Sequence, residues 1–443
     1  MTYFKNINFT NDCYHDSMKR IHRQAVELLT NQACIVFLSG SGESYHPAGK
    51  IILHWRLQSM IILNEPYVSQ FLLKTAEDFD IPVVDCSPDK SMTAGFPALT
   101  EQEFVAMAQK KSPLALYCNS ENSFSWLSRN FKDTEIPAMI ELFKDKVQFR
   151  KLVKRLYPEF SFAEVAYEDL ATFDTSKIKK PFIIKPAIGF FSMGVYKVEA
   201  DRDWNDIVLA IQAEMDKVRG LYPLEVMNAS KFIIEEFITG SEYAIDAYYD
   251  SHGEPVILNI LEHPFASNGD VSDRLYFTSR KIVKKHLAKF SELLAAIGAV
   301  GKIASFPIHM EVRVDESGQV IPIEVNPMRF AGWCTTDIAH YAYGINVYEM
   351  YLQQKRPDWD QILCREDKAL YCIVVGDVPG DVRFQDIKKV DYPAYAANFS
   401  NLLELRKVDY KKYPVFAFAF ISIAEDPAVI AELLQLDTCP YIS

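Results

Sequence analysis

The stretch that decides the fold is IHMEVRVDESGQVIPIEVNPMRF, residues 308–330. Two mainly apolar segments flank the turn sequence ESGQ, which predicts two antiparallel strands joined as a hairpin. Glu311 lies in the first strand, and Glu324 and Asn326 lie near the end of the second. Because side chains alternate along a strand, Glu324 and Asn326 share a face, and the hairpin can bring Glu311 beside them. Two carboxylates and one amide oxygen form a hard, anionic site that suits Mg²⁺, with Mn²⁺ as a substitute.

The alternative is that these acids form ion pairs with Arg313 and Lys302 on an exposed sheet. Both glutamates, however, stand within runs that are otherwise apolar. Carboxylates in such surroundings are rarely without a task, so the pattern favours the metal site.

Further up the chain, a lysine interrupts the apolar strand PFIIKPA, residues 181–187. Lys185 stands just before a proline, so its ammonium group must either reach a sheet edge or find an anion. In the loop that follows, Gly189 and Gly194 bracket Ser192. Such a loop can turn backbone N–H groups towards phosphate oxygens, although a plain hairpin with an irregular turn is the alternative.

The stretch KFIIEEFITGSEYAIDAYYD, residues 231–250, predicts a strand, a glycine turn and an alternating second strand. Glu235 and Glu236 stand at the end of the first strand. A strand end of this kind can offer backbone groups to the edge of an adenine while a carboxylate accepts hydrogen bonds from ribose hydroxyls. The alternative is that these acids are surface charges at a strand end.

A long loop is expected over HPFASNGDVSDRLYFTSRK, residues 263–281. Long ordered loops in compact domains usually have a function. His263 and Arg274 in this loop are therefore candidates for substrate recognition. A contact between subunits is the alternative.

Around these motifs the chain predicts three parts: an open α/β domain over residues 1–135, a central domain over 136–360, and a small α+β cap over 361–443. In the first part, a helix is expected over 16–30, and strands at 33–40, 59–64, 81–87 and 113–118. The loop SGSGES after the first of these strands lacks a phosphate-binding fingerprint and is expected to be a surface loop.

The central part begins with a basic helix, ELFKDKVQFRKLVKRL over residues 141–156, whose lysines are expected on a solvated face. In the last part, strands are expected at 369–377 and 414–423 around a helix at 398–408. This cap could complete an acceptor pocket or build a homodimer interface.

The composition, 49% hydrophobic and 24% charged, is that of an ordinary globular protein. A net charge of -12 over 443 residues argues against a general positive field for nucleic acid or for an anionic membrane. Neither a secretory leader nor a membrane-spanning run is expected, and the eight cysteines are scattered, so a cytoplasmic protein with reduced thiols is predicted. Cys334, near the hairpin, is expected to be a buried thiol.

The motifs in their order resemble the ATP-grasp superfamily: D-K at residues 145–146, I-I-K-P, I-I-E-E-F, M-E-V-R and I-E-V-N-P, together spanning about residues 140–355. The resemblance implies a two-lobed fold with ATP between two α+β subdomains. It places Lys146 and Lys185 on the phosphates and the loop of Gly189, Ser192 and Gly194 above them. It further implies that Glu242 accepts hydrogen bonds from the ribose. The residues that would frame the adenine are Glu235, Glu236, Phe237 and Ile238, and the magnesium ligands would be Glu311, Glu324 and Asn326.

Arg329 corresponds to an arginine that relatives often have directly after Asn-Pro, whereas here Met328 intervenes. The resemblance gives Arg329 a catalytic role beside Lys185. It would hold the substrate carboxylate or acyl phosphate through two parallel hydrogen bonds. An ion pair with Asp337 is the alternative.

The stretch EVNPMRFAGW, residues 324–333, is most similar to ATP-grasp ligases that couple amino acids or peptides. This implies that ATP activates a small-molecule carboxylate as an acyl phosphate, which is then joined to an amine with release of ADP and phosphate. Amino acids are the expected substrates. The alternatives are an ATP-grasp kinase, a carboxylate–thiol ligase and a non-catalytic ATP-binding sensor or assembly protein.

Overall fold

The computed structural model describes residues 59–93, 95–111, 113–189, 194–218, 228–267, 272–380 and 382–443. The helix expected over 16–30, the strand over 33–40 and the loop after it lie outside these residues. The described chain is mixed α/β and α+β, as predicted. None of its helices is long and apolar enough to cross a membrane.

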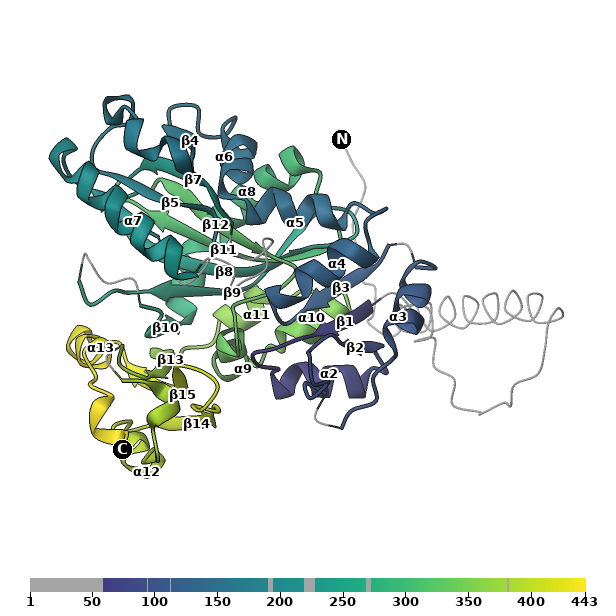
Figure 1. Ribbon diagram of the computed structural model, residues 1–443. Helices are drawn as coiled ribbons and strands as arrows, with labels where there is room; N and C mark the ends of the chain where they lie inside the picture. Colours follow the sequence, from purple (N-terminus) through teal and green to yellow (C-terminus); the bar gives the residue numbers. More distant parts are fainter. Residues whose placement is uncertain are drawn as a thin grey trace, which may run out of the picture. The chain divides into compact units, whose positions relative to one another are not determined.

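The first described part is a parallel sheet of three strands in the order β2-β1-β3 (Figure 1). Its strands are β1 (Ser59–Leu63), β2 (Val83–Asp85) and β3 (Ala115–Cys118), and its helices are α2 (Gln70–Asp78), α3 (Glu101–Ala108) and α4 (Phe124–Asn130). All residues of the three strands are buried, as is usual for parallel strands. Helix α3 begins at a capping box formed by Thr100 and Glu103. The three strands predicted in this region are confirmed.

One lobe of the central part is an antiparallel sheet of four described strands in the order β4-β7-β5-β6. The strands are β4 (Phe162–Ala166), β5 (Phe182–Ile188), β6 (Tyr196–Val198) and β7 (Asn228–Glu236). Helix α7 (Trp204–Val218) turns an apolar stripe towards this sheet. The core between them comprises Trp204, Val208, Ile211 and Met215 of the helix and Phe182, Ile184, Phe232 and Ile234 of the strands.

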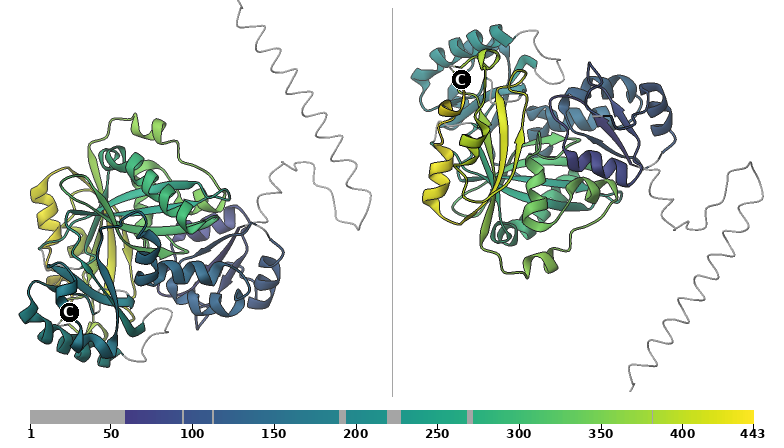
Figure 2. Two further views of the ribbon diagram at one scale, coloured as in Figure 1. Left: turned by 90° about the horizontal axis from the view of Figure 1, so that it is seen from above. Right: turned by 90° about the horizontal axis from the view of Figure 1, so that it is seen from below.

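The other lobe belongs to a sheet of eight described strands in the order β12-β11-β8-β9-β10-β13-β15-β14. The strands are β8 (Ser241–Tyr249), β9 (Pro255–His263), β10 (Leu275–Thr278), β11 (Phe306–Val314), β12 (Val320–Pro327), β13 (Ala369–Asp377), β14 (Leu402–Lys407) and β15 (Val415–Ala424). Helix α8 (Arg280–Gly301) packs along β9, and Figure 2 shows the same sheet from above and below. Three short helices follow β12, namely α9 (Ile338–Tyr343), α10 (Val347–Leu352) and α11 (Trp359–Leu363).

The single basic helix predicted over residues 141–156 is wrong. The segment forms α5 (Ile136–Lys144) and α6 (Lys146–Val153), which are separated at Asp145. Asp145 has an extended backbone, and its carboxylate accepts hydrogen bonds from the N–H groups of Val147 and Gln148, so it caps α6. The prediction that its lysines lie on a solvated face also fails at Lys144 and Lys146, which are buried.

The cap predicted over residues 361–443 does not have a sheet of its own. Its strands β13, β15 and β14 continue the eight-stranded sheet from β10. The helix expected at 398–408 is wrong, because Leu402–Lys407 is strand β14 and pairs with β15. Pairing with a neighbouring strand has overridden the helical propensity of its leucines, glutamate and arginine. The helices of this segment are α12 (Tyr392–Ala396) and α13 (Pro427–Leu434).

A tight turn, residues 237–240, connects β7 of the four-stranded sheet to β8 of the eight-stranded sheet. Gly240 has φ +108°, and a Cβ atom there would lie 2.1 Å from the carbonyl oxygen of Val314. The turn is therefore packed directly against the end of β11.

Replacing Gly240 by alanine should lower the free energy of unfolding by roughly 2–4 kcal/mol, because strain at a positive φ is added to a clash with backbone. Gly95 is a matched control, since it has φ +90° but nothing within 4 Å of the added Cβ. Urea denaturation should show a clearly larger loss for Gly240→Ala than for Gly95→Ala. Equal losses would contradict the close approach.

Candidate active site

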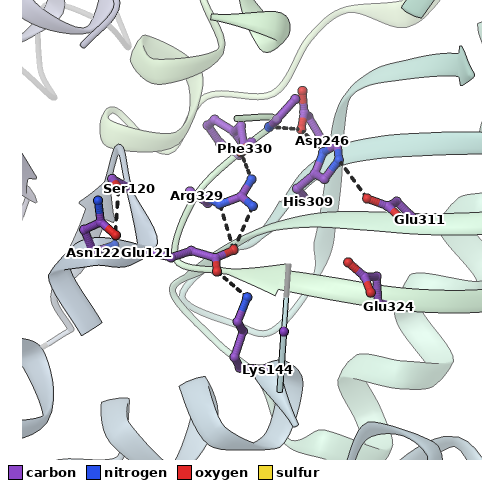
Figure 3. Close-up of polar contacts among 12 residues, drawn as sticks. Ser120, Glu121, Asn122, Lys144, Asp246, His309, Glu311, Glu324, Arg329 and Phe330 are labelled. Atoms are coloured by element: carbon purple, nitrogen blue, oxygen red, sulfur yellow. Dashed lines mark hydrogen bonds and ion pairs between the residues drawn. The ribbon is translucent and has the colours of Figure 1, made fainter. Parts of the chain in front are cut away.

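Glu311 and Glu324 are direct cross-strand partners on β11 and β12. Asn326 lies opposite His309 in the same pair of strands, so the predicted ligands share one face. Figure 3 shows Glu311 and Glu324 side by side on the neighbouring strands. The predicted hairpin is confirmed, and it brings Glu311 beside Glu324.

The two glutamates have different electrostatic surroundings. Burial raises the pKa of Glu311 well above its ordinary value, and the negative charges of Glu324 and Glu242 raise it further. Burial alone would also raise the pKa of Glu324, but the positive charges of Lys146 and Lys185 hold it below the usual range. The Lys146 Nζ lies 2.9 Å from the Glu324 carboxylate.

The residues present fit a divalent cation, because Glu311 and Glu324 are cross-strand partners whose carboxylates repel each other, and a cation would offset this repulsion. In the part of the chain that the structure describes, no three His, Cys, Asp or Glu side chains converge on one point. An ion here would therefore share the two carboxylates with the amide oxygen of Asn326 and with oxygens of a ligand. Arg313, the alternative partner for these acids, instead binds Glu242.

Lys146 is the first residue of α6 and is buried. The positive end of a helix dipole disfavours a lysine at this position, and burial adds a desolvation cost. Glu324 offsets these costs, and the Lys146 Nζ also lies 3.4 Å from the carbonyl oxygen of Gly189. The predicted phosphate lysine is thus held between the acidic pair and the start of the glycine loop.

Lys185, on β5, finds its anion within the protein. Its Nζ lies 2.8 Å from Glu235 on β7, and the other oxygen of Glu235 accepts a hydrogen bond of 2.6 Å from the Nε of Arg150. Arg150 also donates to the carbonyl oxygens of Pro322 and Ile323, at 2.6 Å and 3.3 Å. One buried guanidinium therefore connects the partner of Lys185 to the strand that carries Glu324. Sequence reasoning missed Arg150 because it placed this segment on a solvated helix.

The predicted adenine frame lies at the end of β7 and in the turn after it. Glu236 accepts a hydrogen bond of 2.8 Å from the N–H of Ser161, and the N–H of Phe237 donates to Pro181. The carbonyl oxygen of Ile238 accepts a hydrogen bond from Arg313. The side chain of Glu235 is already bound by Lys185 and Arg150.

The glycine loop is described only at its two ends. Gly189 lies beside Lys146, and Gly194 adopts φ +69°, which suits glycine. Ser192 lies outside the described residues.

Arg329 is bound to the first part of the chain. Its Nε and one terminal nitrogen donate to Glu121, at 3.1 Å and 2.7 Å, and Lys144 binds the other oxygen of that carboxylate (Figure 3). Burial would raise the pKa of Glu121, but the charges of Lys144 and Arg329 lower it to about 2. The alternative, an ion pair between Arg329 and Asp337, is wrong, because Asp337 binds Arg406, Ser69 and Tyr348. Glu121 follows β3, at the end of a parallel strand where ligands commonly bind.

Asp246 on β8 is a second residue that sequence reasoning missed. Its fully buried carboxylate accepts hydrogen bonds from His309 (2.8 Å), the N–H of Ala331 (2.7 Å) and Thr336 (2.6 Å). It therefore joins β11 to the segment after Asn326. The sequence does indicate this residue, because an aspartate within the apolar strand EYAIDAYYD requires buried hydrogen-bond partners.

The two residues of this loop predicted for substrate recognition, His263 and Arg274, bind different partners. His263 ends β9, and its Nδ1 lies 3.3 Å from Glu242, the predicted ribose acceptor. Arg274 binds Asp377 at 3.1 Å and the carbonyl oxygens of Leu434 and Leu436. Its geometry favours attachment of the C-terminal segment, and part of the expected long loop is strand β10 instead.

Sequence and structure comparisons agree on the fold. Residues 178–337 match the family model described as ATP-grasp domain, and no curated protein matches the sequence. An L-amino acid ligase from Bacillus licheniformis has a TM-score of 0.63 at 18% identity, with 87% of this chain and 98% of that chain covered. An N5-carboxyaminoimidazole ribonucleotide synthetase from Thermotoga maritima has a TM-score of 0.59 at 13% identity, with 87% and 99% covered. A biotin carboxylase from Campylobacter jejuni has a TM-score of 0.58 at 12% identity, with 87% and 92% covered. The chain thus carries an ATP-grasp domain at residues 178–337 and has the ATP-grasp fold around it.

Proposed function

We propose that the chain is an ADP-forming ligase that joins a small-molecule carboxylate to an amine through an acyl phosphate. The observation that carries the proposal is the approach of Lys146 to the acidic pair on β11 and β12, beside Lys185 and the glycine loop. A sensor that only binds ATP would not need an arginine fixed by a buried glutamate at the same site. The structures of similar fold include an L-amino acid ligase, which supports this class of reaction.

In the first step, a carboxylate oxygen of the substrate attacks the γ-phosphorus, the bond to the β-phosphate oxygen breaks, and ADP leaves. Lys146 and Lys185 would offset charge on the transferred group, and bound Mg²⁺ would add Lewis-acid stabilisation. In the second step, the amine nitrogen bonds to the acyl carbon and phosphate leaves. Glu121 fixes the guanidinium of Arg329 before either substrate arrives, so less ordering is needed when a carboxylate binds.

The acceptor side of the site would include residues from all three predicted parts. Trp333 makes ring contacts with Tyr67 from the first part and with Tyr413 and Phe418 from the last, at centroid distances of 6.2, 5.3 and 5.6 Å. Such an aromatic surface favours substrates with apolar side chains.

Incubating the protein with Mg-ATP and pooled amino acids and amines should release ADP and phosphate in equal amounts. Mass spectrometry should show a product at the summed masses of two substrates minus water. A phosphorylated product without free phosphate would instead identify a kinase, and a product formed only with thiols would identify a thiol ligase. ATP binding without turnover on any pool would favour a sensor, and no ATP binding would contradict the proposal.

A further inference from the structure

The proposed reaction leaves Arg313, the arginine of the motif M-E-V-R, without a task. Its partly buried guanidinium makes three kinds of contact. Two of its nitrogens lie 3.0 Å from the same carboxylate oxygen of Glu242. A third nitrogen donates to the carbonyl oxygen of Ile238 at 2.7 Å, and the guanidinium carbon lies 5.4 Å from the centre of the Phe237 ring.

These three partners are the residues proposed to hold two different parts of a nucleoside. Glu242 is the proposed ribose acceptor, and Phe237 and Ile238 are the end of the proposed adenine frame. A planar guanidinium with donors in a fixed fork can hold a carboxylate and a carbonyl group at a set distance from each other. Arg313 therefore sets the position of the ribose acceptor relative to the base frame.

The turn between the two sheets is held at neighbouring points of the same strand. Arg313 and Val314 pair with Glu242 and Ser241 at the end of β11. Gly240 packs against the carbonyl oxygen of Val314, and Arg313 binds Ile238. The base frame thus has little freedom to move away from Glu242.

The second oxygen of Glu242 has its own neighbour. His263 lies opposite Glu242 on β9, and its Nδ1 is 3.3 Å from that oxygen. The imidazole stacks on the ring of Tyr276, with the centroids 4.0 Å apart. Two donors of Arg313 and one of His263 leave the carboxylate one acceptor position for a hydroxyl group, on the oxygen beside His263, because a carboxylate offers about four in all.

We propose that Arg313 is a positioning residue of the nucleotide site, which acts through Glu242 and Ile238 and makes ATP affinity depend on the ribose hydroxyls. The inference rests on the proposed function, since it takes ATP as the ligand. It goes further in naming the residue that gives the site its selectivity for a ribonucleotide.

The test compares the Kd values of Mg-ATP, 2′-deoxyATP and 3′-deoxyATP for the full chain by isothermal titration calorimetry. The wild type should lose on the order of tenfold in affinity with at least one of the two deoxy analogues, because a hydrogen bond to a charged acceptor is lost. Arg313→Met should bind ATP on the order of tenfold more weakly, and its ratio of deoxyATP to ATP Kd should fall to within about twofold of one. A role in stability alone would not change that ratio.

Arg280 provides a matched control. Its guanidinium binds one carboxylate (Asp367), donates to one carbonyl oxygen (Ile362, 3.1 Å) and lies 6.0 Å from one aromatic ring (Tyr343). Arg280→Met should keep the ATP affinity and the ratio of the wild type. Arg313→Lys serves if Arg313→Met does not fold, since a lysine cannot reproduce the fork, and the ratio should fall there too.

Two results would overturn the inference and leave the ligase proposal intact. One is a ratio of deoxyATP Kd to ATP Kd near one in the wild type, and the other is a folded Arg313 variant that keeps the full wild-type ratio. If neither the wild type nor Arg280→Met binds ATP, the proposed function itself is overturned and the inference with it.

Discussion

Replacing Glu324 by glutamine is expected to abolish turnover, with a fall in kcat on the order of 10³-fold or more, while the protein stays folded. The substitution keeps the volume of the side chain but removes a charge from the proposed metal site. A metal ion that stabilises a transferred phosphoryl group contributes several kcal/mol, and each 1.36 kcal/mol is about tenfold in rate. Phosphate release with the substrates found in the product assay measures the effect.

Glu316→Gln is the matched control for this prediction. Glu316 lies in the exposed turn of the same hairpin, so the same change there should leave turnover and folding as they are. Calorimetry adds a measurement that needs neither the carboxylate nor the amine substrate. Mg²⁺ should strengthen ATP binding to the wild type far more than to Glu324→Gln. Normal turnover in a folded Glu324→Gln protein would count heavily against the metal assignment.

Replacing Glu235 by glutamine is expected to lower the free energy of unfolding by about 3–5 kcal/mol. The glutamate is buried between Lys185 and Arg150, and its loss leaves two buried cations without an anion. Urea denaturation should show the loss, and hydrogen exchange should show weaker protection of β5 and β7.

The pH dependence of the free energy of unfolding is a second test of the contacts of Glu235 with Lys185 and Arg150. Burial would raise the pKa of Glu235, but Arg150 and Lys185 lower it from 4.5 to about 2. Because the folded pKa is the lower one, the stabilisation is complete above about pH 4.5 and is lost as the pH falls towards about 2. The gap between wild type and Glu235→Gln should therefore be widest above about pH 4.5 and should shrink on acidification.

Glu236→Gln is the control, since an amide oxygen can still accept the hydrogen bond from Ser161. It should cost well under 1 kcal/mol. Equal losses for the two variants, or a gap that does not change with pH, would contradict the buried network.

The hairpin at residues 306–327 shows what a sequence can predict of a site. Its strands, turn and the pairing of Glu311 with Glu324 follow from alternation along each strand and from the turn residues, which are local properties. The strand of Lys185 and the three strands of the first sheet were predictable for the same reason.

One of the two errors has a local cause, and the other depends on the tertiary structure. The break at Asp145 depends on one capping side chain within a long basic stretch, and strand β14 forms because β15 lies beside it. The helical propensity of a short segment predicts neither the break at Asp145 nor the formation of β14.

The sequence by itself determined which residue types stand on the same face of a strand, and thereby the acidic pair and the lysines of the candidate site. Only the tertiary structure decided their partners: Arg329 with Glu121, Lys185 with Glu235, and Asp246 with His309. The physical reason is that alternation fixes which face a side chain takes, whereas its ion-pair partner depends on which distant segment the fold brings to that face. Arg329 and Glu121, which are 208 residues apart, meet only because the segment after β3 and the hairpin lie together.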